Sequence, residues 1–89
     1  MSTETELVFN HLIELPYVGC IFCSTREPET GKVRLFLIFR ERRRVYIRNG
    51  IKETWEELTD QRLYDFVMQT FNKVILERKV PCFTALTSL

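Results

Sequence analysis

Two short runs rich in β-branched and aromatic residues, 33–40 and 45–48, lie so close together that they are expected to pair with each other. Only four residues, 41–44, separate them. The turn dipeptide Asn49-Gly50 follows the second run. The sequence therefore predicts an antiparallel hairpin over residues 33–48.

The length of the connecting loop decides which side chains share a face of this hairpin. A three-residue loop, 41–43, would pair Phe39 with Val45. One face would then be wholly apolar and lie under helices, and it would consist of Val33, Leu35, Leu37, Phe39, Val45 and Ile47. The opposite face would consist of Arg34, Phe36, Ile38, Arg40, Arg44, Tyr46 and Arg48. Loops of two or four residues would place Arg44 or Arg48 among the apolar residues, at a cost that a small core does not tolerate.

Helical patterns are predicted on both sides of the hairpin. Residues 3–15 carry apolar side chains at helical spacing before Pro16 and predict a first helix, although residues 7–10 also suit the start of a strand. Thr54-Trp-Glu-Glu57 fits a capping box, and Thr59-Asp60 is a second helix-start signal. A period of 3.6 residues then predicts a long helix to about Arg78.

A third strand is predicted over residues 17–24, followed by a turn at 26–32. The predicted fold is a single α+β domain over residues 1–89, a two-layer sandwich of helix, three-stranded antiparallel sheet and helix. Residues 82–89 form a tail that could add an edge strand. This order resembles the layout of double-stranded-RNA-binding domains and of the Alu-RNA-binding proteins of the signal recognition particle. The chain lacks the lysine-rich start of the last helix that characterises the first family.

Basic charge is concentrated in the predicted hairpin. Six arginines lie between Arg34 and Arg48, whereas the whole chain has a formal net charge of only +1. Arginine with aromatic residues suits nucleic-acid bases and phosphates, and it equally suits a protein interface. The candidate partner- or nucleic-acid-binding residues are Arg34, Phe36, Arg40, Arg42, Arg43, Arg44, Tyr46 and Arg48.

A small, non-enzymatic binding or regulatory protein is the leading hypothesis for the function. Eleven aromatic residues are many for 89 residues, and small domains often bury such a surplus by self-association. The expected partner is therefore a second copy, giving a homodimer, or another protein. RNA or DNA binding by residues 34–48 is the alternative. Against it, twelve acidic residues nearly balance thirteen basic ones, so the long-range field is weak.

No cofactor, metal or small-molecule substrate is expected. Cys20 and Cys23 have metal or redox spacing, but residues three apart on a strand point to opposite faces. Zinc would also need Cys82 and His11, so structural cysteines are the expectation and zinc or redox chemistry the alternatives. His11 is expected half-buried in the core. No nucleophile–base pair or phosphate loop supports an enzyme.

The ends of the chain complete the sequence-based expectations. The first residues do not read as a signal peptide, and no apolar stretch reaches the length of a membrane span, so a cytoplasmic or nuclear protein with reduced thiols is expected. The last residues, Thr87-Ser88-Leu89, match a pattern read by domains that capture a C-terminal carboxylate.

Overall fold

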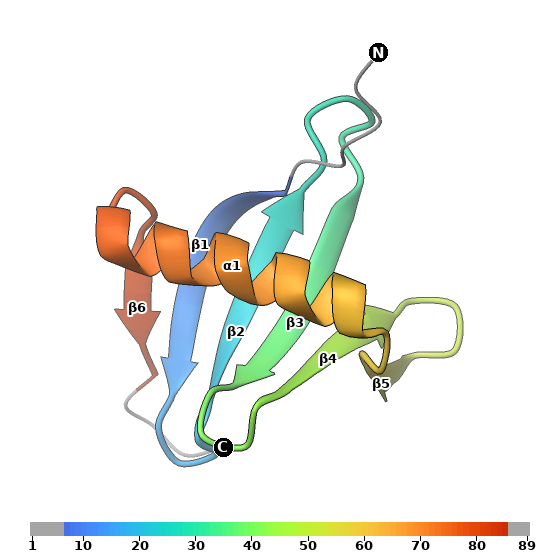
Figure 1. The fold of residues 1–89 in the computed structure, drawn as a ribbon, viewed down its shortest axis with the longest axis horizontal. Coiled ribbons are helices and arrows are strands. Elements are labelled where there is room, and N and C mark those ends of the chain that lie inside the picture. Colours follow the sequence, from blue (N-terminus) through green and yellow to red (C-terminus); the bar gives the residue numbers. More distant parts are fainter. Residues whose placement is uncertain (1–6, 86–89) are drawn as a thin grey trace.

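One helix crosses a six-stranded sheet in the computed structural model, which describes residues 7–85 (Figure 1). The elements are β1 (Val8–Leu15), β2 (Cys20–Arg26), β3 (Val33–Phe39), β4 (Arg44–Asn49), β5 (Thr54–Glu57), α1 (Gln61–Glu77) and β6 (Cys82–Thr84). Strands β1 to β5 form an antiparallel meander in the order of the chain, and β6 returns to pair parallel to β1 at the far edge.

The turns of the meander follow local chemistry that the sequence displays. Gly31, with a φ of 73°, completes the β2–β3 turn, as predicted for residues 26–32. At the β4–β5 turn the side-chain oxygen of Asn49 accepts hydrogen bonds from the backbone N–H groups of Ile51 and Lys52, both at 3.1 Å. Asn49 therefore acts as the turn residue that the Asn49-Gly50 dipeptide predicted.

Helix α1 covers one face of the sheet and closes the hydrophobic core. Its N-cap is Asp60, whose carboxylate accepts from the N–H groups of Arg62 and Leu63. The helix buries Val67 and Phe71. With them the core comprises Phe9, Leu12, Ile21, Cys23, Phe36, Ile38 and Val45. The long helix predicted from the 3.6-residue period is thus confirmed, with its start at the second of the two signals.

The predicted first helix is wrong, because residues 8–15 form strand β1. The pairing of β1 with β2 shifts register between Phe9 and His11, which is a β-bulge at Asn10. The extra residue turns Phe9 and Leu12 to the same face, and both are buried under α1. Apolar residues three apart on one face mimic a helical period. The bulge therefore produced the pattern that the sequence analysis interpreted as a helix.

The predicted fold class is wrong as a consequence. The structure has one helix and a mixed six-stranded sheet in place of two helices on a three-stranded sheet. Residues of the predicted capping box, Thr54 to Glu57, form β5 and lie opposite β4. The layout shared with the two RNA-binding families depended on the first helix and is lost with it. The suggested C-terminal edge strand does form, as β6.

The predicted faces of the β3–β4 hairpin are also wrong for β3. The connection has four residues, 40–43, so Ile38 pairs with Val45 and Phe36 with Ile47. Arg43 takes the left-handed conformation, with a φ of 55°, that closes this longer turn. One additional loop residue inverts every side chain of β3 relative to β4. Phe36 and Ile38 therefore face the helix, and Leu35, Leu37 and Phe39 face away from it.

Two further expectations concern a membrane span and the C-terminal residues. No helix within residues 7–85 is long and apolar enough to cross a membrane. The C-terminal pattern Thr87-Ser88-Leu89 lies outside the described residues.

Candidate interaction surface

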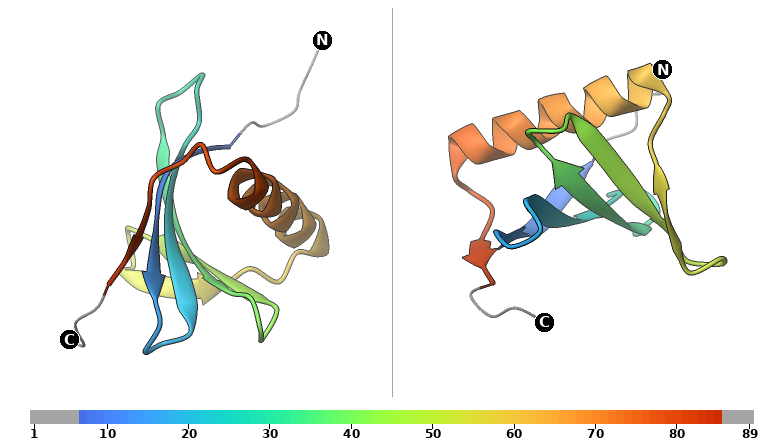
Figure 2. Two further views of the ribbon diagram at one scale, coloured as in Figure 1. Left: turned by 90° about the vertical axis from the view of Figure 1, so that its left-hand side faces the viewer. Right: turned by 90° about the horizontal axis from the view of Figure 1, so that it is seen from below.

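The sheet face opposite α1, here called the outer face, is covered by no other helix or sheet of described residues, although the β4–β5 end of the sheet curls toward it (Figure 2, left). Because side chains alternate along each strand, the pairing registers show which residues lie on it. Apart from the buried Cys20, its apolar members are Val8, Ile13, Leu15, Phe22, Val33, Leu35, Leu37, Phe39, Tyr46, Trp55 and Phe83. Most of these are half-buried by their neighbours, but Val33 and Phe83 remain 56% and 58% exposed. An open face of this composition is typical of an interface rather than of a solvated sheet.

Aromatic side chains contact one another across the β2–β5 half of this face. The rings of Phe39 and Tyr46 pack edge to face with their centroids 5.6 Å apart. Those of Phe22 and Trp55 pack in the same way at 6.3 Å, although β3 and β4 lie between their strands. The sheet therefore curls on this side and brings β5 toward β2 (Figure 2).

Two arginines lie against these rings, and a third pairs with a carboxylate on the same face. Arg48 places its guanidinium carbon 5.5 Å from the centre of the Trp55 ring, and Arg42 lies 5.7 Å from that of Phe39. Arg44 donates to the carboxylate of Glu57 at 3.3 Å. We call the whole group the aromatic–arginine cluster, and it consists of Phe22, Phe39, Arg42, Arg44, Tyr46, Arg48 and Trp55. Arginine stacked on aromatic rings is enriched in protein interfaces.

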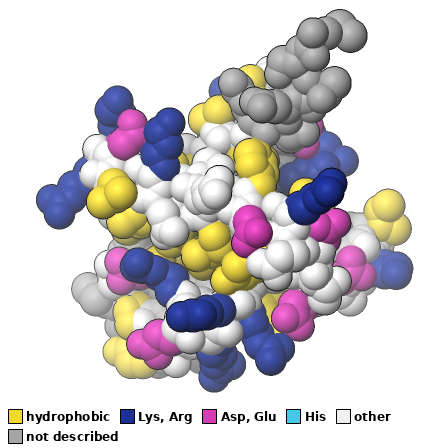
Figure 3. Space-filling view, in the orientation of Figure 1, with side chains coloured by type: hydrophobic (Ala, Val, Ile, Leu, Met, Phe, Trp, Pro, Cys, Tyr) yellow, Lys and Arg dark blue, Asp and Glu magenta, His cyan; other side chains and the backbone are white. Residues whose placement is uncertain are grey.

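The structure brings together only half of the predicted site residues. Of the predicted set, the cluster contains Arg42, Arg44, Tyr46 and Arg48. Phe36 is 2% exposed and belongs to the core. Arg34 pairs with Glu27 at 3.1 Å on the helix side, and Arg40 lies over the ring of Phe71 on α1 at 5.8 Å. Arg43 lies in the β3–β4 turn. Lys and Arg side chains gather where this turn meets the helix side (Figure 3).

Three members of the cluster were missed from the sequence: Phe22, Phe39 and Trp55. Phe39 was assigned to the core because the loop was counted as three residues. Trp55 was placed at the start of a helix by the capping-box pattern. A period-two reading of Thr54 to Glu57 would have placed Trp55 and Glu57 on one face of a strand, as the structure does.

Two of the three cysteines are buried in β2. Cys20 and Cys23 point to opposite faces of β2 and are both buried, whereas Cys82 is exposed at the edge. Burial raises the pKa of Cys20, and burial together with the neighbouring thiols raises that of Cys23 to about 12. Within residues 7–85 no three metal-ligating side chains cluster together. His11 is half-buried on the outer face of β1 rather than in a helix-covered core.

Comparison of the chain with protein-family models, curated protein sequences and solved structures found no match.

Proposed function

We propose that this chain is a small binding protein that self-associates through its outer face, forming a homodimer. The observation that carries the proposal is the composition of this face: eleven apolar side chains, five of them aromatic, lie on one open side of the sheet. Each residue keeps part of its surface in contact with water in the isolated chain. Packing two such faces against each other removes that surface from water.

The size of the outer face suits a second copy. The six strands hold 35 residues, and at about 3.3 Å per residue and about 4.8 Å between strands they present at most about 550 Å² when laid flat. Two copies would bury at most about 1,100 Å² in total, which is close to the lower limit for a specific interface. A homodimer with a two-fold axis satisfies both copies at once, because the same patch is used twice.

Charge favours one orientation of the two copies. Most arginines of the outer face lie toward β4 and β5, with Arg26 at the end of β2, whereas its β1 and β6 half carries Ile13, Leu15 and Phe83. A two-fold axis parallel to the strands places the arginine-bearing half of each copy over the apolar half of the other. An axis perpendicular to the strands would bring the arginines of both copies together, which costs electrostatic energy.

Nucleic-acid binding is the second candidate function, and the observation that favours it is the stacking of arginines on aromatic rings. Such surfaces bind single strands by base stacking and phosphate pairing. The aliphatic half of the outer face does not contribute to this chemistry. Arg44 is already paired with Glu57. Both features favour self-association.

The test is sedimentation velocity of the purified chain at tens of micromolar, with and without single-stranded nucleic acid, at low and moderate salt. We expect a dimer that is insensitive to nucleic acid. Leu37→Arg, at the centre of the outer face, should give a monomer. Leu76→Arg, on the helix surface where Leu76 is 82% exposed, is the matched control and should leave the dimer intact. A wild-type monomer, or a monomer that gains mass only with nucleic acid, would overturn the proposal.

The described cysteines are all unpaired thiols, which fits the reducing interior of a cell. We therefore place the proposed dimer in the cytoplasm or the nucleus.

A further inference from the structure

Strands β3 and β4 diverge and leave a cleft in the sheet. β3 pairs with β2 from Val33 onward, but with β4 only between Phe36 and Phe39. β4 meanwhile stays paired with β5 as far as Asn49. The resulting opening has a volume of about 580 Å³, and the diverging strands are visible in Figure 1. Within residues 7–85 no strand pairs with the β4 side of residues 33–35.

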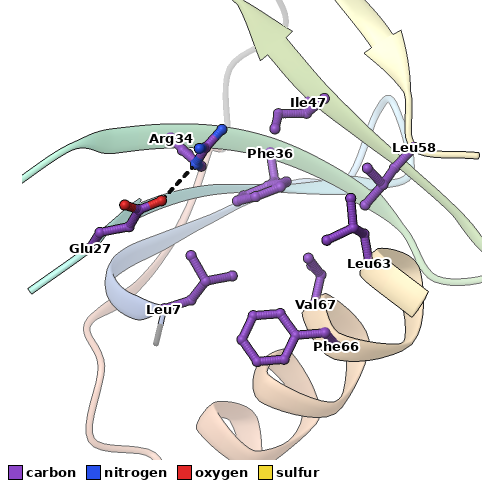
Figure 4. A pocket seen from close by; sticks show the side chains of 9 residues that line it. All are labelled: Leu7, Glu27, Arg34, Phe36, Ile47, Leu58, Leu63, Phe66 and Val67. Carbon is purple, nitrogen blue, oxygen red and sulfur yellow. Dashed lines mark hydrogen bonds and ion pairs between the residues drawn. The ribbon is translucent and has the colours of Figure 1, made fainter. Parts of the chain in front are cut away.

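An apolar cavity of about 230 Å³ adjoins this cleft on the helix side (Figure 4). Its apolar lining is Leu7, Phe36, Ile47, Leu58, Leu63, Phe66 and Val67. Arg34 and Ile47 line both spaces, so the cleft and the cavity lie side by side. The cavity is larger than the roughly 150 Å³ of an apolar cavity that takes up benzene. One leucine or phenylalanine side chain can therefore enter it.

The cleft is basic. Lys32, Arg34 and Arg48 line it, against a single carboxylate, Glu56. Glu56 already accepts from the amide of Asn49 and lies 3.9 Å from Lys52. Lys32 makes no ion pair with any described residue. An acidic ligand would therefore meet cations that are not fully neutralised.

At the polar end of the cavity Glu27 is held by Arg34. The hydrogen bond from Arg34, and a second from Thr30, lower the pKa of Glu27. Glu27 is therefore ionised at neutral pH and pairs with Arg34, and the charge of Lys32 also lowers its pKa. The remaining positive charge toward the cleft belongs chiefly to Lys32 and Arg48.

We infer that this cleft binds an extended acidic segment of a partner protein, which adds as a strand along β3 and places one large apolar side chain in the cavity. Backbone groups alternate along a strand, so at least one of the residues 33–35 directs its N–H and C=O toward the cleft. Such an edge recognises an extended peptide by main-chain hydrogen bonds. The cleft shares Val33, Leu35 and Arg48 with the outer face, but the inference rests on the cleft and the cavity and does not depend on self-association.

The alternation of side chains specifies the peptide. A residue that faces the helix side enters the cavity, and its two neighbours face the outer side, where Arg48 lies. The preferred sequence is thus acidic–apolar–acidic. A neutral or basic segment would supply no negative charge to Lys32 and Arg48.

Fluorescence anisotropy with a labelled seven-residue peptide tests this. The peptide has a central leucine flanked by glutamates, with threonines at the remaining positions. We expect saturable binding, at least tenfold weaker when serine replaces the leucine, because the cavity then stays empty. N-methylation of alternate amides should abolish binding when it blocks the edge facing β3 and leave it unchanged on the other edge.

Variants of the protein locate the site. Lys32→Glu should lower the affinity for the glutamate-flanked peptide severalfold and raise the affinity for a lysine-flanked version. Lys73→Glu on α1, where the side chain lines neither space, is the matched control. Leu37→Arg should bind the peptide like the wild type. No binding below millimolar peptide, or equal binding of the serine peptide, would each overturn the inference.

Discussion

Arg48 lies across the ring of Trp55, with 5.5 Å between the guanidinium carbon and the ring centre, and the two residues face each other on neighbouring strands. The pair shows how this chain accommodates arginine on an otherwise apolar face. The stem of Arg48 and the indole cover each other, and the guanidinium remains accessible to a partner. The aromatic surface and the basic charge are therefore parts of one surface.

Aromatic residues of this surface should contribute more to self-association than its arginines. Trp55→Ala removes a large anchor that also contacts Phe22, and we expect at least a tenfold increase in the dimer dissociation constant. Arg48→Gln keeps most of the aliphatic stem and should change the dimer dissociation constant by less than about threefold. Sedimentation equilibrium of both variants measures the two constants, and a larger effect of Arg48→Gln would contradict the proposed role of the rings.

The inverted faces of β3 can be tested with two Phe→Ala variants. Phe36 is 2% exposed in the core, whereas Phe83 is 58% exposed on β6. Phe36→Ala should lower the free energy of unfolding by about 3–5 kcal/mol, and Phe83→Ala by about 1 kcal/mol or less. Urea denaturation, at concentrations below self-association, gives both values. Equal costs would mean that Phe36 does not lie under α1.

Alkaline pH should destabilise the fold through Cys23. Burial, then the neighbouring thiols Cys20 and Cys82, raise the pKa of Cys23 from 9.0 to about 12. The folded state thus holds this proton more tightly than the unfolded state. The resulting stability is fully present below pH 9 and is lost as the pH rises toward 12, by about 1.4 kcal/mol per pH unit.

The comparison of wild type with Cys23→Ala isolates this effect from other titrating groups. At pH 7 the variant should be less stable by about 1–3 kcal/mol, because a small buried group is removed. Between pH 9 and 11 the difference should shrink, since the variant has no thiol to ionise. Cys82→Ala, at an exposed position, should keep the wild-type slope. A difference that is constant with pH would contradict the burial of Cys23.

Helix α1 should depend on Asp60 and not on Thr54. Asp60 accepts from two backbone N–H groups of the first turn, so Asp60→Ala should cost about 1 kcal/mol of stability. Thr54 lies on the exposed edge strand β5. Thr54→Ala should leave the helical circular dichroism signal unchanged and should shift the melting temperature of the protein by no more than about a degree. A loss of helicity in Thr54→Ala would support the capping box instead.

The sequence was sufficient to predict those elements whose conformation depends only on residues close in sequence. The long helix, the Asn49-Gly50 turn and the presence of strands near the predicted residues 17–24 and 33–40 follow from periodicity and turn residues, although β2 lies two to three residues later, at Cys20–Arg26. The opposite orientation of Cys20 and Cys23 follows from the geometry of any strand. For these features the neighbours in sequence are also the neighbours that determine the conformation.

Tertiary packing determined the conformation of residues 8–15 and the faces of β3, because one additional residue in a strand or loop moves every following side chain to the opposite face. The bulge at Asn10 gave β1 the spacing of a helix, and the four-residue turn at 40–43 exchanged the two faces of β3. Neither is encoded by composition. Each is selected because it places Phe9, Leu12, Phe36 and Ile38 together against Val67 and Phe71 of a helix far along the chain. The number of arginines and of aromatic residues could be counted from the sequence. Which aromatic rings the arginines contact depends on the pairing of strands and follows only from the tertiary structure.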